Sequence, residues 1–202
     1  MGFGINSMWY GLLGFGAIVL YDINNLNRNN DRLQSLYGVG GGLLGLALID
    51  QINQGVQKTN LTPMWLRIVF GALAAVFFVL LVYATMYAGG RMRWGRQAEG
   101  KKNDHWWEKD LSDRGLFALC RHPAVWLLFL MDMCLVVAVG MDYVCAIIYN
   151  VAGLLLAYYE DRNVFPELIK GYDRYKKTTP FLLPTGASIR RCRETWKKNK
   201  EK

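Results

Sequence analysis

The chain is organised around five long apolar segments, with most of its charged residues in the stretches between and after them. The segments are residues 5–22, 36–52, 63–90, 123–141 and 143–159. A helix needs about 20 apolar residues to cross about 30 Å of hydrocarbon, so each segment is a candidate membrane span. Residues 140–142 leave so short a connection that the last two spans are expected to form a helical hairpin. The predicted fold class is an all-α, polytopic membrane protein with about five transmembrane helices, a C-terminal hairpin and a cytoplasmic cap.

Positive charge is concentrated near the C-terminus. The chain has 24 Lys and Arg against 16 Asp and Glu, and residues 161–202 hold 12 and 5 of these, a net of +7 out of +8. Short loops rich in Lys and Arg stay on the cytoplasmic side of a membrane. The basic segments 24–35, 89–114 and 161–202 alternate with less basic ones, which predicts an external N-terminus and a cytoplasmic C-terminus. A four-span alternative, with the first segment lying in the interface, would place the N-terminus inside.

The apolar blocks exclude a disordered chain, a disulfide-rich secreted scaffold and a soluble domain. The expected partner is the lipid bilayer, whose anionic headgroups attract basic segments, and no nucleic-acid partner is expected. One membrane domain is expected over residues 1–202. It is divided into a three-span region at 1–110, a hairpin and cap at 111–184, and a basic tail at 185–202.

Small and polar residues inside the spans give further expectations. The pairs Gly38/Gly42 and Gly41/Gly45 have the small-xxx-small spacing that lets helices approach closely, within one chain or between chains. Asp132 lies inside the fourth segment, as either a functional position or a neutral acid bonded to a neighbouring helix. The 4 cysteines form no CxxC pair and the chain has only 2 histidines, so free thiols and no metal site are predicted.

Polar residues crowd the predicted cytoplasmic ends of the hairpin. Arg121 and His122 directly precede Pro123, which suits the first turn of a helix. The N–H groups of that turn and the two cationic side chains could bind a carboxylate or phosphate. Glu160 and Asp161 end the fifth span on the same side, so an anion-binding end is expected beside a carboxylate pair. These residues could also be simple interfacial anchors.

The residues around the hairpin form a recognisable pattern. The matching positions are Gly115, Phe117, Arg121, His122 and Pro123, then Glu160 and Asp161, then Tyr172 and Tyr175, and finally Pro180 and Pro184. In this order and spacing, residues 115–184 resemble the integral-membrane methyltransferases that include isoprenylcysteine carboxyl methyltransferase and phosphatidylethanolamine N-methyltransferase. Asp161 replaces the second of two glutamates in the pattern. The resemblance does not extend to the first two spans.

The resemblance implies a cofactor, an acceptor and a set of site residues. S-adenosylmethionine would be contacted by His122, Pro123, Glu160 and Asp161, and the pocket would be closed by Tyr172, Tyr175 and Pro180. Arg121 and Glu160 would be catalytic: Arg121 would orient the acceptor, and Glu160 would accept a proton from an ammonium acceptor. The acceptor would be a lipid or small hydrophobic molecule with a carboxylate, amine or thiol, reached at the cytoplasmic face.

Three positions depart from the family pattern. Val125 replaces a tyrosine, Leu127 replaces a glycine, and Ile169 replaces the glycine of a Phe-Gly pair. These changes leave open a non-catalytic, lipid- or partner-binding member of the same fold. A membrane reductase that uses NADPH on a related scaffold is a further alternative, although the chain is short for it and lacks a dinucleotide fingerprint.

Overall fold

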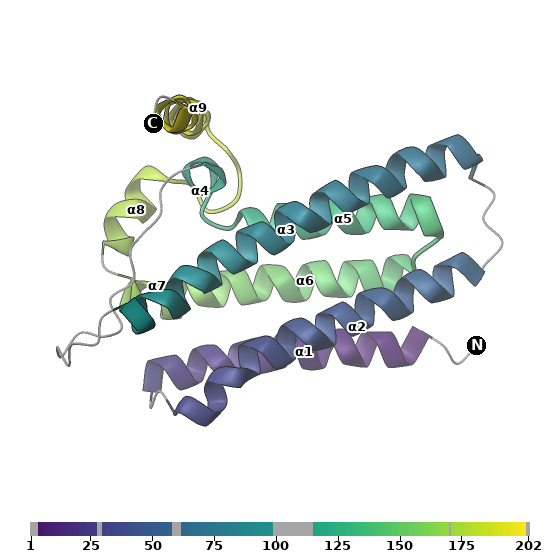
Figure 1. The fold of residues 1–202 in the computed structure, drawn as a ribbon, viewed down its shortest axis with the longest axis horizontal. Coiled ribbons are helices and arrows are strands. Elements are labelled where there is room, and N and C mark those ends of the chain that lie inside the picture. The colour runs from purple at the N-terminus through teal and green to yellow at the C-terminus, as the bar shows by residue number, and fades with distance from the viewer. Residues whose placement is uncertain (1–3, 28–29, 58–61, 99–114, 170, 201–202) are drawn as a thin grey trace.

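The computed structural model describes residues 4–27, 30–57, 62–98, 115–169 and 171–200, and every regular element in these ranges is helical. The elements are α1 (Gly4–Asn27), η1 (Asp31–Ser35), α2 (Leu36–Gln57), α3 (Met64–Ala98), α4 (Leu116–Leu119), α5 (Pro123–Val139), α6 (Tyr143–Tyr159), η2 (Glu160–Val164), α7 (Phe165–Leu168), α8 (Tyr172–Thr178) and α9 (Gly186–Lys200). The long helices α1, α2, α3, α5 and α6 run along one bundle (Figure 1). The short elements gather at one end of it, and the start of α1 and the α5–α6 connection lie at the other.

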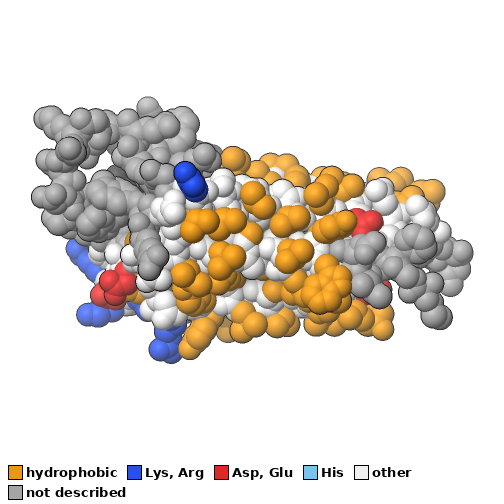
Figure 2. Space-filling view, turned by 90° about the horizontal axis from the view of Figure 1, so that it is seen from below, with side chains coloured by type: hydrophobic (Ala, Val, Ile, Leu, Met, Phe, Trp, Pro, Cys, Tyr) orange, Lys and Arg blue, Asp and Glu red, His pale blue; other side chains and the backbone are white. Residues whose placement is uncertain are grey.

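Much of the bundle's outer surface is apolar. Three helical stretches are long and apolar enough to cross a membrane: Arg32–Gln57, Met64–Met86 and Tyr143–Leu168. Pro123–Val139 is a shorter apolar helix. Figure 2 shows hydrophobic side chains across the middle of one face, with most of its charged side chains toward the end that carries the short elements. The all-helical fold and its membrane-compatible helices therefore agree with the class predicted from sequence.

Local sequence signals determine the bounds of α5 and α6. Pro123 occupies the first turn of α5, where no N–H is needed. Gly140 ends α5 in the left-handed conformation, with φ 74°, and donates its N–H to the carbonyls of Leu135 and Val136. Asp142 caps α6 by accepting from the N–H groups of Val144 and Cys145. The chain thus reverses within three residues, and α6 returns beside α5 (Figure 1).

The interior is packed mainly with small and medium side chains. α1 packs on α2, α3 packs on α5, and α5 packs on α6. The core residues include Ala47, Ala74, Met131, Ala146 and Tyr149. Because lipid is as apolar as these side chains, close packing and hydrogen bonds hold such helices together.

A few buried polar contacts join the long helices. Asp132 on α5 is 1% exposed and accepts a 2.7 Å hydrogen bond from Nδ2 of Asn150 on α6. This arrangement matches the second of the two expectations for Asp132, an acid bonded to a neighbouring helix. At the other end of the bundle from the short elements, Gln51 donates to Oγ of Ser7 at 2.6 Å. Tyr149 donates to the Ser7 carbonyl oxygen, also at 2.6 Å.

The glycines that touch another helix differ from those the spacing predicted. An added Cβ on Gly38, Gly41, Gly42 or Gly45 would meet nothing within 4 Å among the residues that the structure describes. The α1–α2 contact instead runs through a different pair, because a Cβ on Gly40 would lie 2.8 Å from the carbonyl oxygen of Gly14. For contacts among the described residues of one chain, the packing predicted for the other four glycines was wrong, and packing between chains stays a prediction. The spacing identified the helix but not the face of it that α1 covers.

Candidate functional site

The candidate site lies at the end of the bundle where the short elements meet. It is assembled from the segment before α5, from η2, and from α8 with the residues that follow it. Residues 180–182 pass along the start of α5 and are held there by backbone contacts. Arg121 N–H donates to the Pro180 carbonyl at 2.9 Å, and His122 N–H donates to the Phe181 carbonyl at 3.3 Å. Three segments distant in sequence thus become one unit.

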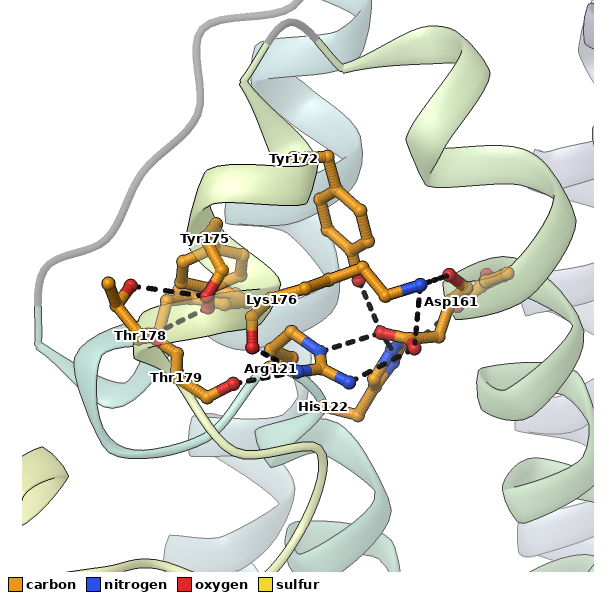
Figure 3. Close-up of polar contacts among 10 residues, drawn as sticks. Arg121, His122, Asp161, Tyr172, Tyr175, Lys176, Thr178 and Thr179 are labelled. Atoms are coloured by element: carbon orange, nitrogen blue, oxygen red, sulfur yellow. Dashed lines mark hydrogen bonds and ion pairs between the residues drawn. The ribbon is translucent and has the colours of Figure 1, made fainter.

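A buried ion pair lies at the centre of this unit (Figure 3). Arg121 donates from Nε to Asp161 Oδ1 at 2.7 Å and from Nη2 to Oδ2 at 3.1 Å, so the pair is bidentate. The two side chains are only 9% and 8% exposed. Nη1 of Arg121 donates to the carbonyl oxygens of Thr179 at 2.7 Å and Lys176 at 3.2 Å. The guanidinium therefore joins the start of α5 to η2 and to the end of α8.

Asp161 has further donors on α8. The Tyr172 hydroxyl donates to its Oδ1 at 2.6 Å, and Lys176 Nζ donates to its backbone carbonyl at 3.0 Å. Burial, followed by the hydrogen bond to this carboxylate, raises the pKa of Tyr172 far above its usual value. Tyr172 is therefore a neutral hydrogen-bond donor at any physiological pH. Tyr175, one turn away, donates its hydroxyl to the Phe117 carbonyl and so fastens α8 to α4.

His122 lies beside the ion pair and is 6% exposed. Its ring stacks on Phe165 with centroids 5.7 Å apart and meets the edge of Phe181 at 5.1 Å. Its Nδ1 lies 3.9 Å from Glu160 Oε2 and its Nε2 lies 3.5 Å from Asp161 Oδ1. Nε2 is buried and makes no geometrically acceptable hydrogen bond within the described residues. His122 is thus held in the cluster by ring contacts and by a long contact to Asp161 rather than by a short hydrogen bond.

Burial lowers the pKa of His122 below its ordinary 6.5, and the nearby Asp161 only partly opposes this effect. Below about pH 6.5 His122 is protonated in the unfolded chain but stays largely neutral in the folded chain. The free energy of unfolding therefore decreases as the pH falls. We expect thermal unfolding of the full chain in detergent to shift downward between about pH 7 and pH 5. His122→Phe keeps the ring contacts and should reduce this shift. An unchanged shift in His122→Phe would contradict this role for His122.

The structure brings most of the predicted site residues together. Arg121, His122, Asp161 and Tyr172 form one contact cluster, and Pro180 joins it through its carbonyl. Pro123 is buried as the first residue of α5. Tyr175 donates its hydroxyl to the Phe117 carbonyl, and its ring lies 5.8 Å from that of Tyr172. Glu160 is close to His122 and its side chain is 20% exposed, more than that of Asp161. Of the two carboxylates, Glu160 is the more accessible.

Several contributors to the site were not predicted. Phe165 and Phe181 provide the rings around His122, and the carbonyls of Lys176 and Thr179 receive Arg121. The carbonyl contacts have no side-chain signature, so no motif could have identified them. The aromatic residues were visible in sequence, but only the fold places both of them next to one histidine.

The N-terminal helices also reach this end of the bundle. The rings of Tyr21 on α1 and Tyr37 on α2 lie 5.2 Å apart, and the Tyr37 hydroxyl donates to the Thr85 carbonyl on α3. Asp22 on α1 is 5% exposed, and α1 contacts η2, the turn that carries Glu160 and Asp161. The motif-bearing half of the chain therefore shares this region with helices that the resemblance does not cover.

The backbone at one departure from the family pattern is compatible with the residue present. Ile169 has φ −118° and ψ 111°, an extended conformation open to any residue. The left-handed position that favours glycine falls two residues later, at Gly171 with φ 79°. Leu127 is 7% exposed and belongs to the buried face of α5. The replacement at Ile169 thus requires no backbone strain.

All four cysteines are free, and three of them are buried. Among the residues that the structure describes, no group of three His, Cys, Asp or Glu could hold a metal ion.

Comparison with known proteins found no matching family model, curated protein or solved structure.

Proposed function

We propose that this chain is an S-adenosylmethionine-dependent membrane methyltransferase that acts on a lipidic or small hydrophobic acceptor. The observation that supports this proposal best is the convergence of the motif residues. Arg121 and His122, Asp161, and Tyr172 come from three separate segments and meet in one buried cluster at the end of an apolar bundle. Family-like spacing that arose by chance would not be expected to produce such a cluster.

The proposed membrane arrangement has five spans, with the N-terminus outside and the C-terminus in the cytoplasm. α1 and α5 would join the three stretches that are long and apolar enough to cross a membrane. α5 has 17 residues and is about 26 Å long at 1.5 Å per residue, close to the thickness of the hydrocarbon. The basic end of the chain and the Arg121 cluster lie at the same end of the bundle, which would be the cytoplasmic end.

The residues present suit the proposed cofactor. S-adenosylmethionine carries an ammonium, a sulfonium, ribose hydroxyls and an aromatic base. The Glu160 carboxylate could accept from the ammonium or the hydroxyls, and the rings of Phe165 and Phe181 offer surfaces for stacking or for a cation. Nε2 of His122 is a buried polar atom whose nearest charged partner among the described residues is Asp161 Oδ1, at 3.5 Å. When bound, the cofactor would supply an electrophilic methyl group.

The chain's own residues would align the reactants and exclude water. In-line displacement from a sulfonium depends mainly on alignment, so a rigid and buried site is suitable. We propose that Arg121 acts here as a positioning residue, because its guanidinium is engaged by Asp161, Lys176 and Thr179. Glu160, the more accessible carboxylate, would accept a proton from an ammonium acceptor, whereas a carboxylate or thiolate acceptor would need no base.

A binding measurement with a matched pair of variants tests this proposal. Purified full-length protein should bind S-adenosylmethionine and S-adenosylhomocysteine, but not NADPH, in isothermal titration calorimetry. Glu160→Gln should weaken binding about 10- to 100-fold, as expected for loss of a charged hydrogen-bond acceptor. Glu167→Gln removes the same charge from an exposed position on α7 and should leave binding unchanged. Equal effects of the two variants would argue against the assigned pocket.

Methyl transfer distinguishes an enzyme from a binding protein of the same fold. Radiolabelled methyl donor would be incubated with the protein and a total lipid extract, and labelled products would be separated by chromatography. Transfer that is lost in Glu160→Gln but kept in Glu167→Gln would support the proposal and identify the acceptor class. Binding of S-adenosylmethionine without transfer would favour the non-catalytic alternative. If neither S-adenosylmethionine nor S-adenosylhomocysteine binds, both the proposed cofactor and the proposed pocket are refuted.

A further inference from the structure

The C-terminal helix α9 lies crosswise to the bundle. Figure 1 views it along its own axis, whereas the long helices run across the picture. If the long helices cross a membrane, α9 therefore lies roughly parallel to the membrane plane. It is placed beside the bundle end that carries the Arg121 cluster, next to α4. This is the orientation of a helix that rests on a bilayer surface.

The two sides of α9 differ in chemistry. Ser188 is fully buried and Arg191, Cys192 and Thr195 are partly buried, so these residues form the side facing the protein. Arg190 and Arg193 are exposed, and Ile189 beside them is 46% exposed. Leu183, in the segment leading to α9, is 70% exposed. The outer side thus combines positive charge with exposed apolar side chains.

The inner side of α9 is tied to the candidate site. Nη1 of Arg191 donates to Oγ1 of Thr179 at 3.3 Å, and Thr179, 1% exposed, gives its carbonyl to Arg121. Farther along the helix, Oγ1 of Thr195 accepts the Gly115 N–H at 3.3 Å. α9 is therefore connected through Thr179 to the buried ion pair. A shift of α9 would change the position of Thr179, whose carbonyl accepts from Arg121.

We propose that the outer side of α9, with Leu183, is a binding surface for anionic lipid headgroups of the surrounding membrane. The charge of the helix supports this partner. Residues 186–200 carry Arg190, Arg191, Arg193, Lys197, Lys198 and Lys200 against the single acid Glu194. Ile189 and Leu183 are placed to enter the headgroup layer, as in other interfacial amphipathic helices. Lipid binding on the outer side would stabilise the Arg191–Thr179 contact on the inner side. The inference depends on a membrane location but not on the proposed methyl transfer.

The test measures how deeply α9 sits in bilayers of different charge. A Cys192→Ser chain would carry an environment-sensitive fluorophore on Ala187→Cys, an exposed position at the start of α9, and a second sample would carry it on Asp173→Cys of α8. Both would be reconstituted in nanodiscs of phosphatidylcholine, with or without phosphatidylglycerol. Phosphatidylglycerol should shift the position-187 emission to shorter wavelength and increase its quenching by spin-labelled lipids. The position-173 signal should remain unchanged, and high salt should reverse the shift.

Charge variants make the test specific to the outer side of α9. Arg190→Gln/Arg193→Gln should lower the equilibrium constant for binding of α9 to the anionic bilayer surface about 30-fold. Each basic residue near an anionic surface contributes about 1 kcal/mol. Arg174→Gln/Lys177→Gln removes the same charge from exposed positions on α8 and should retain the response. The proposal is overturned if position 187 responds equally in neutral lipid, if both pairs of substitutions act alike, or if soluble RNA rather than lipid produces the spectral change. Melting temperatures in detergent verify that each variant is folded.

Discussion

Replacing Arg121 with methionine is expected to lower the free energy of unfolding by about 3–5 kcal/mol, because the buried Asp161 carboxylate loses its bidentate cationic partner. The more distant Lys176 Nζ, 3.7 Å from Oδ2, remains. The carbonyls of Lys176 and Thr179 lose their donor in the same variant. A methionine of similar length keeps much of the packing, so the loss reports mainly on charge and hydrogen bonding. Equilibrium unfolding in mixed detergent micelles, followed by circular dichroism, measures the change.

Two further variants determine the origin of this effect. Arg162→Met removes an exposed arginine whose guanidinium lies over the Tyr158 ring, and it should have little effect on stability. Arg121→Met/Asp161→Leu removes both charges and should recover much of the loss, since an apolar pair can replace a buried ion pair with little penalty. If the double variant is less stable than Arg121→Met, then the carboxylate has sufficient partners in Tyr172 and Lys176 alone.

Gly55→Ala is expected to destabilise the protein by about 1–3 kcal/mol through overpacking. Gly55 lies near the end of α2, against the α5–α6 connection. An added Cβ would lie 2.5 Å from the Val139 carbonyl oxygen and 3.1 Å from both the Gly140 carbonyl carbon and the Met141 nitrogen. All three contacts are with backbone, which cannot move aside as a flexible side chain can. Helix α2 would have to shift away from the connection, and thermal unfolding in detergent would record the loss.

Gly42→Ala is the matched control within the same helix. A Cβ at this position would meet no described residue within 4 Å, so only the helix propensity changes, and alanine is favoured by about 1 kcal/mol. We expect the melting temperature to stay the same or rise. A large loss in Gly42→Ala would indicate that this glycine packs against a surface outside the single chain. Equal stability of Gly55→Ala and the wild type would contradict the described contact.

The sequence predicted helix positions well where local signals mark their ends. The predicted fifth span, residues 143–159, agrees with α6, which begins after the cap at Asp142. In contrast, α2 continues to Gln57 and α3 to Ala98, beyond the predicted residues 52 and 90. Hydropathy indicates where a chain enters the hydrocarbon, but a helix can continue into water without proline or a capping residue to stop it. The ends of the apolar segments therefore underestimated the lengths of α2 and α3.

The candidate site was predictable only in its side chains. The predicted hairpin placed Arg121 and His122 beside Asp161, and the resemblance added Tyr172. The structure brings these four side chains into contact, while their functional roles stay predictions. The backbone partners of Arg121 could not be predicted, because any residue provides a carbonyl. The helix faces that pack against one another could not be predicted from the sequence either, as the glycines of α2 demonstrate. Both depend on three-dimensional contacts that a single sequence does not encode locally.

The wide helical turn at Glu160–Val164 determines the angular phase of α7, which follows it directly. In this π-type turn the Phe165 N–H bonds to the Glu160 carbonyl, five residues back rather than four. One residue more or fewer in a helix rotates all that follows by about 100°. At the present phase Phe165 stacks on His122, and a rotation of about 100° would turn its ring away. Chain length across this turn is therefore more tightly constrained than the identity of its exposed residues, and related chains should tolerate substitution there far better than insertion or deletion.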